Sequence, residues 1–394
     1  MGVETSAALV ALGVVAVAGV AVPWCAVRAL LAAGTGADRA VANYRGHPVA
    51  PVLGVAWPLW AVSLLGTQAV LEAIGRLVPG GSPLALVITR LVDTPLALPL
   101  YAVPFLLAVG VYALGAFDDA FGAGGPKGFR GHLSALRSGR LTTGMVKMLG
   151  IGVLAAFYGA TAAGRVLERS GTLPTWLAEG PAGYLSAWAL SALVIALAAN
   201  LGNLLDLRPG RALKVYGIAV VVPAAAFALG AIDAYHDSVA MFAGEVGGLA
   251  LMPAEQAAVV AGVLLVAFGP VVAVWSADLG ERAMLGDGGA NVMGAVVGYL
   301  LTAVLGLAGL AVAAVLLLAL NLASERVSFS AVFERVALLA WFDRLGRGDR
   351  HAPTPHGAET VERGPDDWTD APSGAAERRS VRYDASGTAS EGED

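Results

Sequence analysis

Charged residues are scarce in this sequence: Asp, Glu, Lys and Arg make up 14% of its 394 residues, whereas 57% are hydrophobic. A soluble protein with so few charges could not cover its surface with polar groups, and the mean hydropathy is +0.70. The sequence therefore predicts a polytopic membrane protein. The formal net charge of −5 indicates little about partners, because the acidic residues concentrate near the C-terminus.

Cysteine and targeting signals are equally sparse. The single cysteine, Cys25, cannot form an internal disulfide, so cysteine usage does not indicate a redox compartment. The first apolar run, residues 6–31, lacks a basic segment before it and is too long for the apolar core of a signal peptide. We expect this run to stay in the protein as a membrane helix.

Long apolar runs, in contrast, are abundant. Those long enough to cross a bilayer are residues 6–31, 51–72, 96–117, 145–166, 182–200, 213–232, 255–275, 290–306 and 308–323. The last two are separated only by a tight joint at Gly306, so one bent helix is an alternative, and residues 241–252 could form a re-entrant segment. The sequence predicts an all-α polytopic membrane protein with about nine transmembrane helices, nine or ten in all.

The distribution of basic residues predicts the orientation of these helices. The loops after the first, third and fifth runs carry Arg39, Arg45, Lys127, Arg130, Arg137, Arg140, Lys147, Arg208, Arg211 and Lys214. By the positive-inside rule these loops face the cytoplasm, and nine spans place three acidic breaks of the apolar pattern on the same face. We therefore expect a cytoplasmic-face active site and a cytoplasmic C-terminus.

The end of the chain has a different composition. Residues 324–345 interleave charges with large apolar side chains, a pattern typical of an amphipathic helix at a membrane interface. From Gly346 onward few large apolar residues remain, and a disordered cytoplasmic tail is expected. The predicted organisation is a transmembrane domain over residues 1–323, an interfacial helix over 324–345 and a tail over 346–394.

The first acidic break is the pair Asp118 and Asp119, at the end of the third apolar run. Two adjacent carboxylates at the end of a membrane helix are energetically costly and suggest a function. A solvated helix end is the structural alternative. Two further acidic breaks, at residues 200–206 and 286–287, favour a site assembled at one membrane face.

The second break spaces polar and cationic residues by three or so positions, which places them on one side of a helical turn. These residues are Asn200, Asn203, Asp206, Arg208, Arg211 and Lys214. Carboxamides and a carboxylate can hold a hydrated Mg²⁺ or a nucleotide, and the cations can pair with phosphates. The alternative is a helix end with capping Asn residues and cations that reach lipid headgroups.

The third break places Asp287 among glycines at the start of a membrane helix, where the backbone can approach an anion closely. Mg²⁺ usually takes one or two carboxylates together with substrate phosphates, although an ordinary Gly-rich turn is the alternative. The basic loop of residues 122–147 either fixes topology alone or attracts a phosphorylated substrate or an anionic lipid.

Four motifs resemble one known family. Residues 117–122 read FDDAFG, residues 200–206 read NLGNLLD, residues 285–294 read LGDGGANVMG, and residues 43–49 read NYRGHPV. In this order and spacing they resemble the polyprenyl-phosphate N-acetylhexosamine-1-phosphate transferase superfamily, over roughly residues 40–325. Each motif alone would be a weak signal.

This resemblance implies an integral enzyme of the bacterial plasma membrane that acts in cell-envelope glycan synthesis. It would transfer a sugar-1-phosphate from a UDP-sugar to polyprenyl phosphate and release UMP, with Mg²⁺ as cofactor and Mn²⁺ as an alternative. The implied partners are the UDP-sugar, the polyprenyl phosphate lipid and the membrane. A homodimer is compatible with the family, and no nucleic acid is expected.

The resemblance also implies roles for individual residues. The catalytic set is Asp118, Asp119 and Asp206; the substrate-binding set is Asn200, Asn203, Lys147, Arg208, Arg211, Lys214 and Arg45; the metal ligands are Asp287 and Asp118. Asp118 and Asp119 match the aspartate pair near the polyprenyl phosphate and the metal, and Asp287 matches a metal-binding aspartate. Lys147 resembles a lysine that reaches phosphate.

The sequence departs from the family pattern at three places. Pro209 occupies the position of a second aspartate, Ala290 replaces a serine, and the His-rich loop of the muramyl-pentapeptide transferase branch is missing. The last departure excludes that branch. The others leave open a non-catalytic relative that binds polyprenyl phosphate or a nucleotide sugar as a scaffold or regulator. A transporter is a further alternative, but it would place polar groups near the bilayer midplane rather than at helix ends.

Overall fold

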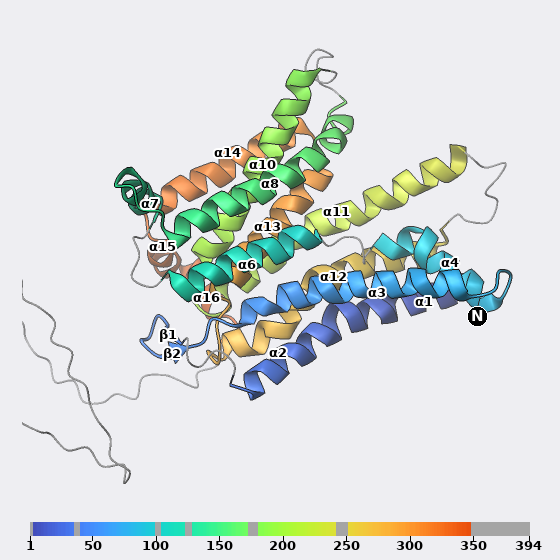
Figure 1. Cartoon of the computed structure of the whole chain (residues 1–394), viewed down its shortest axis with the longest axis horizontal. Coiled ribbons are helices and arrows are strands. Elements are labelled where there is room, and N and C mark those ends of the chain that lie inside the picture. The colour runs from blue at the N-terminus through green and yellow to red at the C-terminus, as the bar shows by residue number, and fades with distance from the viewer. Residues whose placement is uncertain are drawn as a thin grey trace, which may run out of the picture. The chain divides into compact units, whose positions relative to one another are not determined.

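The computed structural model describes residues 3–34, 40–98, 104–122, 128–171, 180–241 and 251–347. The chain divides into two units, Met1–Gly348 and Asp349–Asp394, and the second lies outside the described residues. The described part is almost entirely helical (Figure 1). Its strands are the two-residue β1 (Val41–Ala42) and β2 (Pro48–Val49), which pair antiparallel with Val41 opposite Val49.

The long helices follow one another through the first unit. They are α1 (Val3–Ala16), which continues through the π-helical turn η1 (Val17–Ala21) into α2 (Val22–Ala32), then α3 (Ala56–Leu77), α6 (Phe105–Phe121), α8 (Thr143–Glu168), α10 (Pro181–Leu205), α11 (Arg211–Met241), α12 (Pro253–Leu279), α13 (Gly286–Val304) and α14 (Leu307–Ser324). The shorter elements are η3 (Leu53–Val55), α4 (Pro83–Asp93), η4 (Pro95–Ala97), α7 (Gly128–Arg137), α15 (Phe329–Arg335) and α16 (Ala337–Arg344).

Seven helical stretches in the described part are long and apolar enough to cross a membrane. They are Thr5–Ala32, Leu53–Leu77, Thr143–Glu168, Pro181–Leu205, Arg211–Val239, Pro253–Leu279 and Leu307–Ser324. Each coincides with one of the nine expected spans, so the helical fold is confirmed for the described residues, and seven of the expected spans are helices that could cross a membrane. The other two expected spans, 96–117 and 290–306, correspond to α6 and α13, which do not qualify by the same criteria.

The helix α13 is enclosed by other helices. Most of its side chains are buried, and it packs against α10, α6 and α11. A helix surrounded by protein rather than lipid needs small residues more than large apolar ones. Gly294 is an example, because a Cβ there would lie 2.7 Å from the Cα of Ala199 on α10. The described part of α6 begins at Phe105, and residues 99–103 of the expected span lie outside the described residues.

Several expectations about shorter elements are revised. The basic loop of residues 122–147 contains the helix α7, and the connection after α3 contains α4. The expected single interfacial helix is two helices, α15 and α16, which separate at Val336. Gly306 is extended and divides α13 from α14, so one bent helix is not formed. The candidate re-entrant segment lies largely outside the described residues, as does the tail from residue 348.

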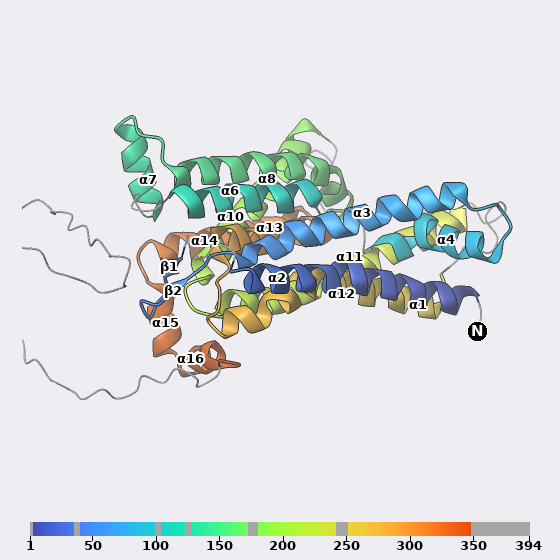
Figure 2. The same cartoon turned by 60° about the horizontal axis from the view of Figure 1, so that its bottom comes forward.

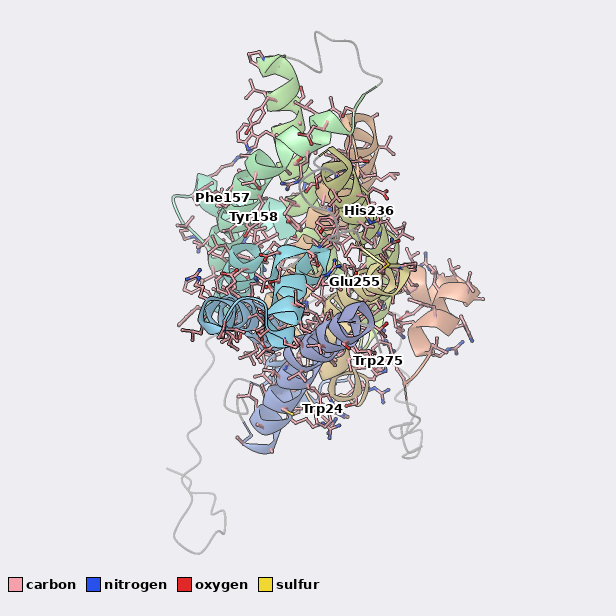
Figure 3. All side chains as sticks on the ribbon, turned by 90° about the vertical axis from the view of Figure 1, so that its right-hand side faces the viewer. Trp24, Phe157, Tyr158, His236, Glu255 and Trp275 are labelled. Atoms are coloured by element: carbon pink, nitrogen blue, oxygen red, sulfur yellow. The ribbon has the colours of Figure 1, made fainter. Side chains whose placement is uncertain are left out.

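Two kinds of side-chain contact connect the helices at residues labelled in Figure 3. Phe157 and Tyr158 on α8 pack edge to face, with ring centroids 5.4 Å apart, and Tyr158 packs in the same way on Tyr299 of α13. Glu255, at the start of α12, is completely buried and lies 3.8 Å from Arg90 of α4. The ion pair therefore ties the short helix α4 to the core of the bundle.

Candidate active site

Three residues from distant parts of the sequence meet at one end of the bundle. Lys147, in the second turn of α8, places its Nζ 2.6 Å from the Oδ2 of Asp118, in the last turn of α6. The same Nζ also contacts the Oδ2 of Asp287, in the first turn of α13. The buried ammonium of Lys147 thus neutralises two carboxylates that are far apart in sequence. We call these three residues together with Asp119 the Asp–Lys cluster.

Asp119 accepts hydrogen bonds from backbone N–H groups, whereas its neighbour Asp118 contacts Lys147. The Oδ1 of Asp119 accepts a hydrogen bond from the backbone N–H of Asp287 at 3.0 Å, and its Oδ2 accepts one from Gly288 at 3.2 Å. Amide groups at a helix N-terminus have no partner within the helix and favour negative charge. Asp119 therefore fixes the start of α13 to the end of α6, and it holds Asp287 in place by doing so.

Glycines make this close approach of α6 and α13 possible. A Cβ on Gly115 would lie 2.5 Å from the Cα of Gly288, a distance that no side chain tolerates. Gly286 adopts a positive φ of 68°, and a Cβ there would lie 2.6 Å from the Oδ2 of Asp119. The glycines of the third motif thus serve backbone packing around the carboxylates.

Asp206 lies at the C-terminal cap of α10, in a pocket beside the Asp–Lys cluster. The pocket is lined among others by Asn43, Tyr44, Arg208 and Asp278. Burial raises the pKa of Asp206 well above the usual range of a carboxyl, and the charges of Asp278, Asp287 and Asp119 raise it further. The pocket therefore disfavours the charged form of Asp206, and a bound cation or hydrogen-bond donor would favour that form.

The three cations that follow Asp206 bind the C-terminal helices. Arg211, fully buried, donates to both carboxylate oxygens of Asp343 at 2.8 and 3.1 Å. Lys214 donates to the backbone carbonyl oxygens of Phe342 and Asp343, each at 2.8 Å. Arg208 pairs with Glu334 and also lies 4.4 Å from the ring centre of Tyr44. Arg211 and Lys214, expected to bind substrate, thus have partners within the protein.

The remaining expected residues lie in separate environments. Asn200 donates to the Oδ1 of Asn321 on α14 at 2.6 Å, so it links two helices. Asn203 lies half-buried one turn before Asp206. Arg45 donates to the Tyr44 hydroxyl at 2.6 Å and lies 3.4 Å from Glu281. Among the described residues, direct side-chain contacts connect the first acidic break to the third, through Lys147 between Asp118 and Asp287. No such contact connects the second break to either of them within the part of the chain that is described.

Asp278, at the end of α12, is a further buried carboxylate of this region that the motifs did not include. Its Oδ2 accepts a hydrogen bond from the backbone N–H of Gly210 at 2.6 Å, and this contact holds the turn that follows Asp206. The signal was present, since Asp278 follows a long apolar run in the same way as Asp118 does. An acidic residue at the end of a membrane helix deserves the same inference in both places.

The donor set determines which metal the Asp–Lys cluster could take. Among the described residues, no three His, Cys, Asp or Glu side chains are grouped as metal ligands. Asp118 and Asp287 nevertheless meet at one Nζ, and Mg²⁺ commonly binds through one or two carboxylates plus substrate phosphates and water. The two carboxylates fit such an ion, but not a metal held by protein ligands alone.

The comparisons with known proteins add no further assignment. Neither the protein-family models nor the curated proteins match this chain. The resemblance therefore depends on the motifs alone. The contacts of Lys147 show that residues of two of these motifs lie close together in the structure.

Proposed function

We propose that this protein transfers a sugar-1-phosphate from a UDP-sugar to a polyprenyl phosphate and releases UMP. One observation carries the proposal: Lys147 contacts both Asp118 and Asp287, although 140 residues separate Lys147 from Asp287 in sequence. The motif resemblance assigns these three residues to one phosphate-handling site. Their contact at the end of three helices supports that assignment.

The reaction joins two anions, so neutralisation of charge is its main requirement. A phosphate oxygen of the acceptor lipid attacks the sugar-bearing β-phosphorus, and the bond between the two phosphates of the donor breaks. The electron pair of that bond leaves with UMP. A lipid phosphate is mostly ionised near pH 7, so the acceptor does not need a catalytic base.

The residues of the Asp–Lys cluster divide this work. Lys147 brings a buried ammonium that can pair with a phosphate of either substrate, and Asp119 positions α13 through two backbone N–H groups. Asp118 and Asp287 would hold a Mg²⁺ ion together with those phosphates. When bound, that ion would supply additional positive charge at the diphosphate. Asp206 lies in the adjoining pocket, where a hydroxyl or amide of the donor could be bound.

A second candidate is a non-catalytic protein that binds polyprenyl phosphate or a nucleotide sugar as a scaffold or regulator. The departures from the family pattern favour this candidate, because Pro209 and Ala290 replace polar residues of that pattern.

Purified protein in detergent distinguishes the two functions. It would be mixed with Mg²⁺, undecaprenyl phosphate and a panel of UDP-sugars that begins with UDP-N-acetylglucosamine, and UMP would be measured. We expect lipid-dependent UMP release that is lost in Asp118→Asn and retained in Asp233→Asn, an exposed aspartate of α11. Binding of undecaprenyl phosphate without UMP from any donor would instead support the scaffold.

A further inference from the structure

The helix α7 lies at the same end of the bundle as the Asp–Lys cluster, between α6 and α8 in sequence. In Figure 2 it runs across the ends of α6 and α8 instead of continuing either of them. One side of α7 faces the protein: Ala135 is buried, and the Nδ1 of His132 forms a hydrogen bond of 2.8 Å with the hydroxyl of Thr142. The helix is therefore attached through a specific contact.

The other sides of α7 and the turn after it face outward with two kinds of side chain. Arg130, Arg137 and Arg140 are exposed, and none forms an ion pair with a carboxylate of the described residues. Leu136 and Leu141 lie beside them, 45% and 64% exposed. Cations next to exposed apolar side chains are typical of a helix that lies in a membrane interface.

We propose that α7 and the following turn bind the anionic phospholipid headgroups of the bilayer that the membrane-spanning helices cross. The guanidinium groups would pair with lipid phosphates, and the two leucines would enter the boundary of the acyl chains. A soluble phosphate would satisfy the arginines but would leave both leucines in water. The helix α7 also directly precedes Thr143–Glu168, a stretch long and apolar enough to cross the bilayer, so lipid headgroups at the start of that stretch are within reach.

This binding would steady the start of α8. Thr142, the partner of His132, caps α8 by accepting a hydrogen bond from the backbone N–H of Met145 at 3.2 Å. The ring of His132 also lies against Gly144, where it leaves no room for a Cβ. Lys147 follows less than one turn later. A lipid-bound α7 would thus restrain the helix that presents the lysine of the Asp–Lys cluster.

Hydrogen exchange of the full-length protein in nanodiscs tests the proposal without any sugar nucleotide or polyprenyl phosphate. Exchange at residues 128–141 would be compared in discs of phosphatidylcholine alone and in discs that also contain phosphatidylglycerol. We expect severalfold slower exchange with phosphatidylglycerol, and loss of that difference in the triple variant Arg130→Gln/Arg137→Gln/Arg140→Gln. The corresponding Arg→Lys triple variant keeps the charge and should keep most of the protection.

A matched control is Arg165→Gln/Arg169→Gln, two exposed arginines at the other end of α8, which should leave exchange in α7 unchanged. Equal exchange of α7 in both kinds of disc, or an undiminished difference in the Gln triple variant, would overturn the proposal. Protection by inorganic phosphate in phosphatidylcholine discs would indicate a soluble-anion site instead. Because the assay contains neither substrate, a failure here is separate from a failure of the transferase function.

Discussion

At the residue scale, Asp119 shows how one member of an aspartate pair can have a role unlike that of the other. Both of its oxygens accept backbone N–H groups of α13. In Asp119→Asn one acceptor becomes a donor, and a backbone N–H loses its partner at a cost of about 1–3 kcal/mol. We expect a lower unfolding temperature in detergent and, in the transfer assay, a higher Mg²⁺ concentration for half-maximal activity.

The second measurement separates positioning from plain destabilisation. A residue that only stabilised the fold would lower the yield of active protein without changing the Mg²⁺ dependence. Asp233→Asn serves again as the matched control. An unchanged Mg²⁺ dependence in Asp119→Asn would mean that the position of Asp287 does not depend on Asp119.

Removal of the Lys147 ammonium should abolish transfer but strengthen metal binding. Lys147→Met removes the ammonium that now neutralises Asp118 and Asp287, so a divalent cation meets no competing charge there. We expect transfer to be lost and Mn²⁺ binding to tighten by about tenfold, which corresponds to about 1.4 kcal/mol. The measurement is the unfolding temperature as a function of Mn²⁺ concentration, since a ligand of the folded state raises it.

Lys147→Arg is the control for this prediction, because it keeps the charge and should bind Mn²⁺ as the parent does. If Mn²⁺ does not raise the unfolding temperature of Lys147→Met more than that of the parent, Asp118 and Asp287 are not metal ligands.

The sequence predicted that three acidic breaks lie at helix ends, because charge is costly in an apolar run and stands out there, but it did not single out Asp278. It did not predict which side chains contact each other. Arg211 and Lys214 share the spacing of a phosphate-binding set with Arg208, yet both are used to hold α16. Their partner Asp343 is distant in sequence, and one periodic pattern fits a substrate site and a protein contact equally well.

At the element scale, the attachment of α15 and α16 depends on a few buried polar contacts. Burial would raise the pKa of Asp343, but the hydrogen bond from Arg211 and the charges of Arg347 and Arg211 bring it below its usual value. A carboxyl with a lowered pKa in the folded state stabilises the protein above its unfolded pKa of about 4. That contribution is lost as the pH falls through the lowered folded value.

Asp343→Asn tests this attachment. It leaves the fully buried guanidinium of Arg211 without its carboxylate, which costs about 3–5 kcal/mol in comparable buried pairs. We expect a lower unfolding temperature at pH 7 and a difference from the parent that shrinks once the pH falls below about 4, and disappears as the pH falls through the lowered folded pKa of Asp343. Glu334→Gln, at an exposed ion pair, should have an effect below about 1 kcal/mol. Equal effects of the two variants would mean that Arg211 does not depend on Asp343.

The helices themselves were predicted with uneven success, for a physical reason. Seven spans were evident because each is long and apolar enough to cross a membrane, and their ends differ from the structure by at most seven residues, as at Val239. The helix α7 was taken for a loop because its Gly-rich surroundings and three arginines mask a short amphipathic pattern. The break between α15 and α16 at Val336 has no proline or glycine that could have announced it.

At the scale of the whole molecule, α13 is the element around which the others gather, since α6, α10 and α11 all pack on it. Neighbouring helices approach α13 closely, and its glycines and alanines leave room for their backbones. The helix that carries Asp287 is therefore buried along most of its length.

The boundary between the two units of the chain falls after Gly348, and it leads to a matched pair of truncations. Arg347 donates to the backbone carbonyl of Pro209 at 3.0 Å and lies 3.1 Å from the Oδ1 of Asp343, so it belongs to the first unit. A chain that stops after Gly348 should keep the unfolding temperature and the UMP release of the full-length protein. A chain that stops after Gly346 loses both contacts of Arg347, and we expect its unfolding temperature to fall.

If the longer truncated chain lost transfer while its unfolding temperature stayed unchanged, residues 349–394 would take part in the reaction itself, for example by recruiting a partner. Equal behaviour of the two truncations would instead show that Arg347 does not stabilise the turn after Asp206.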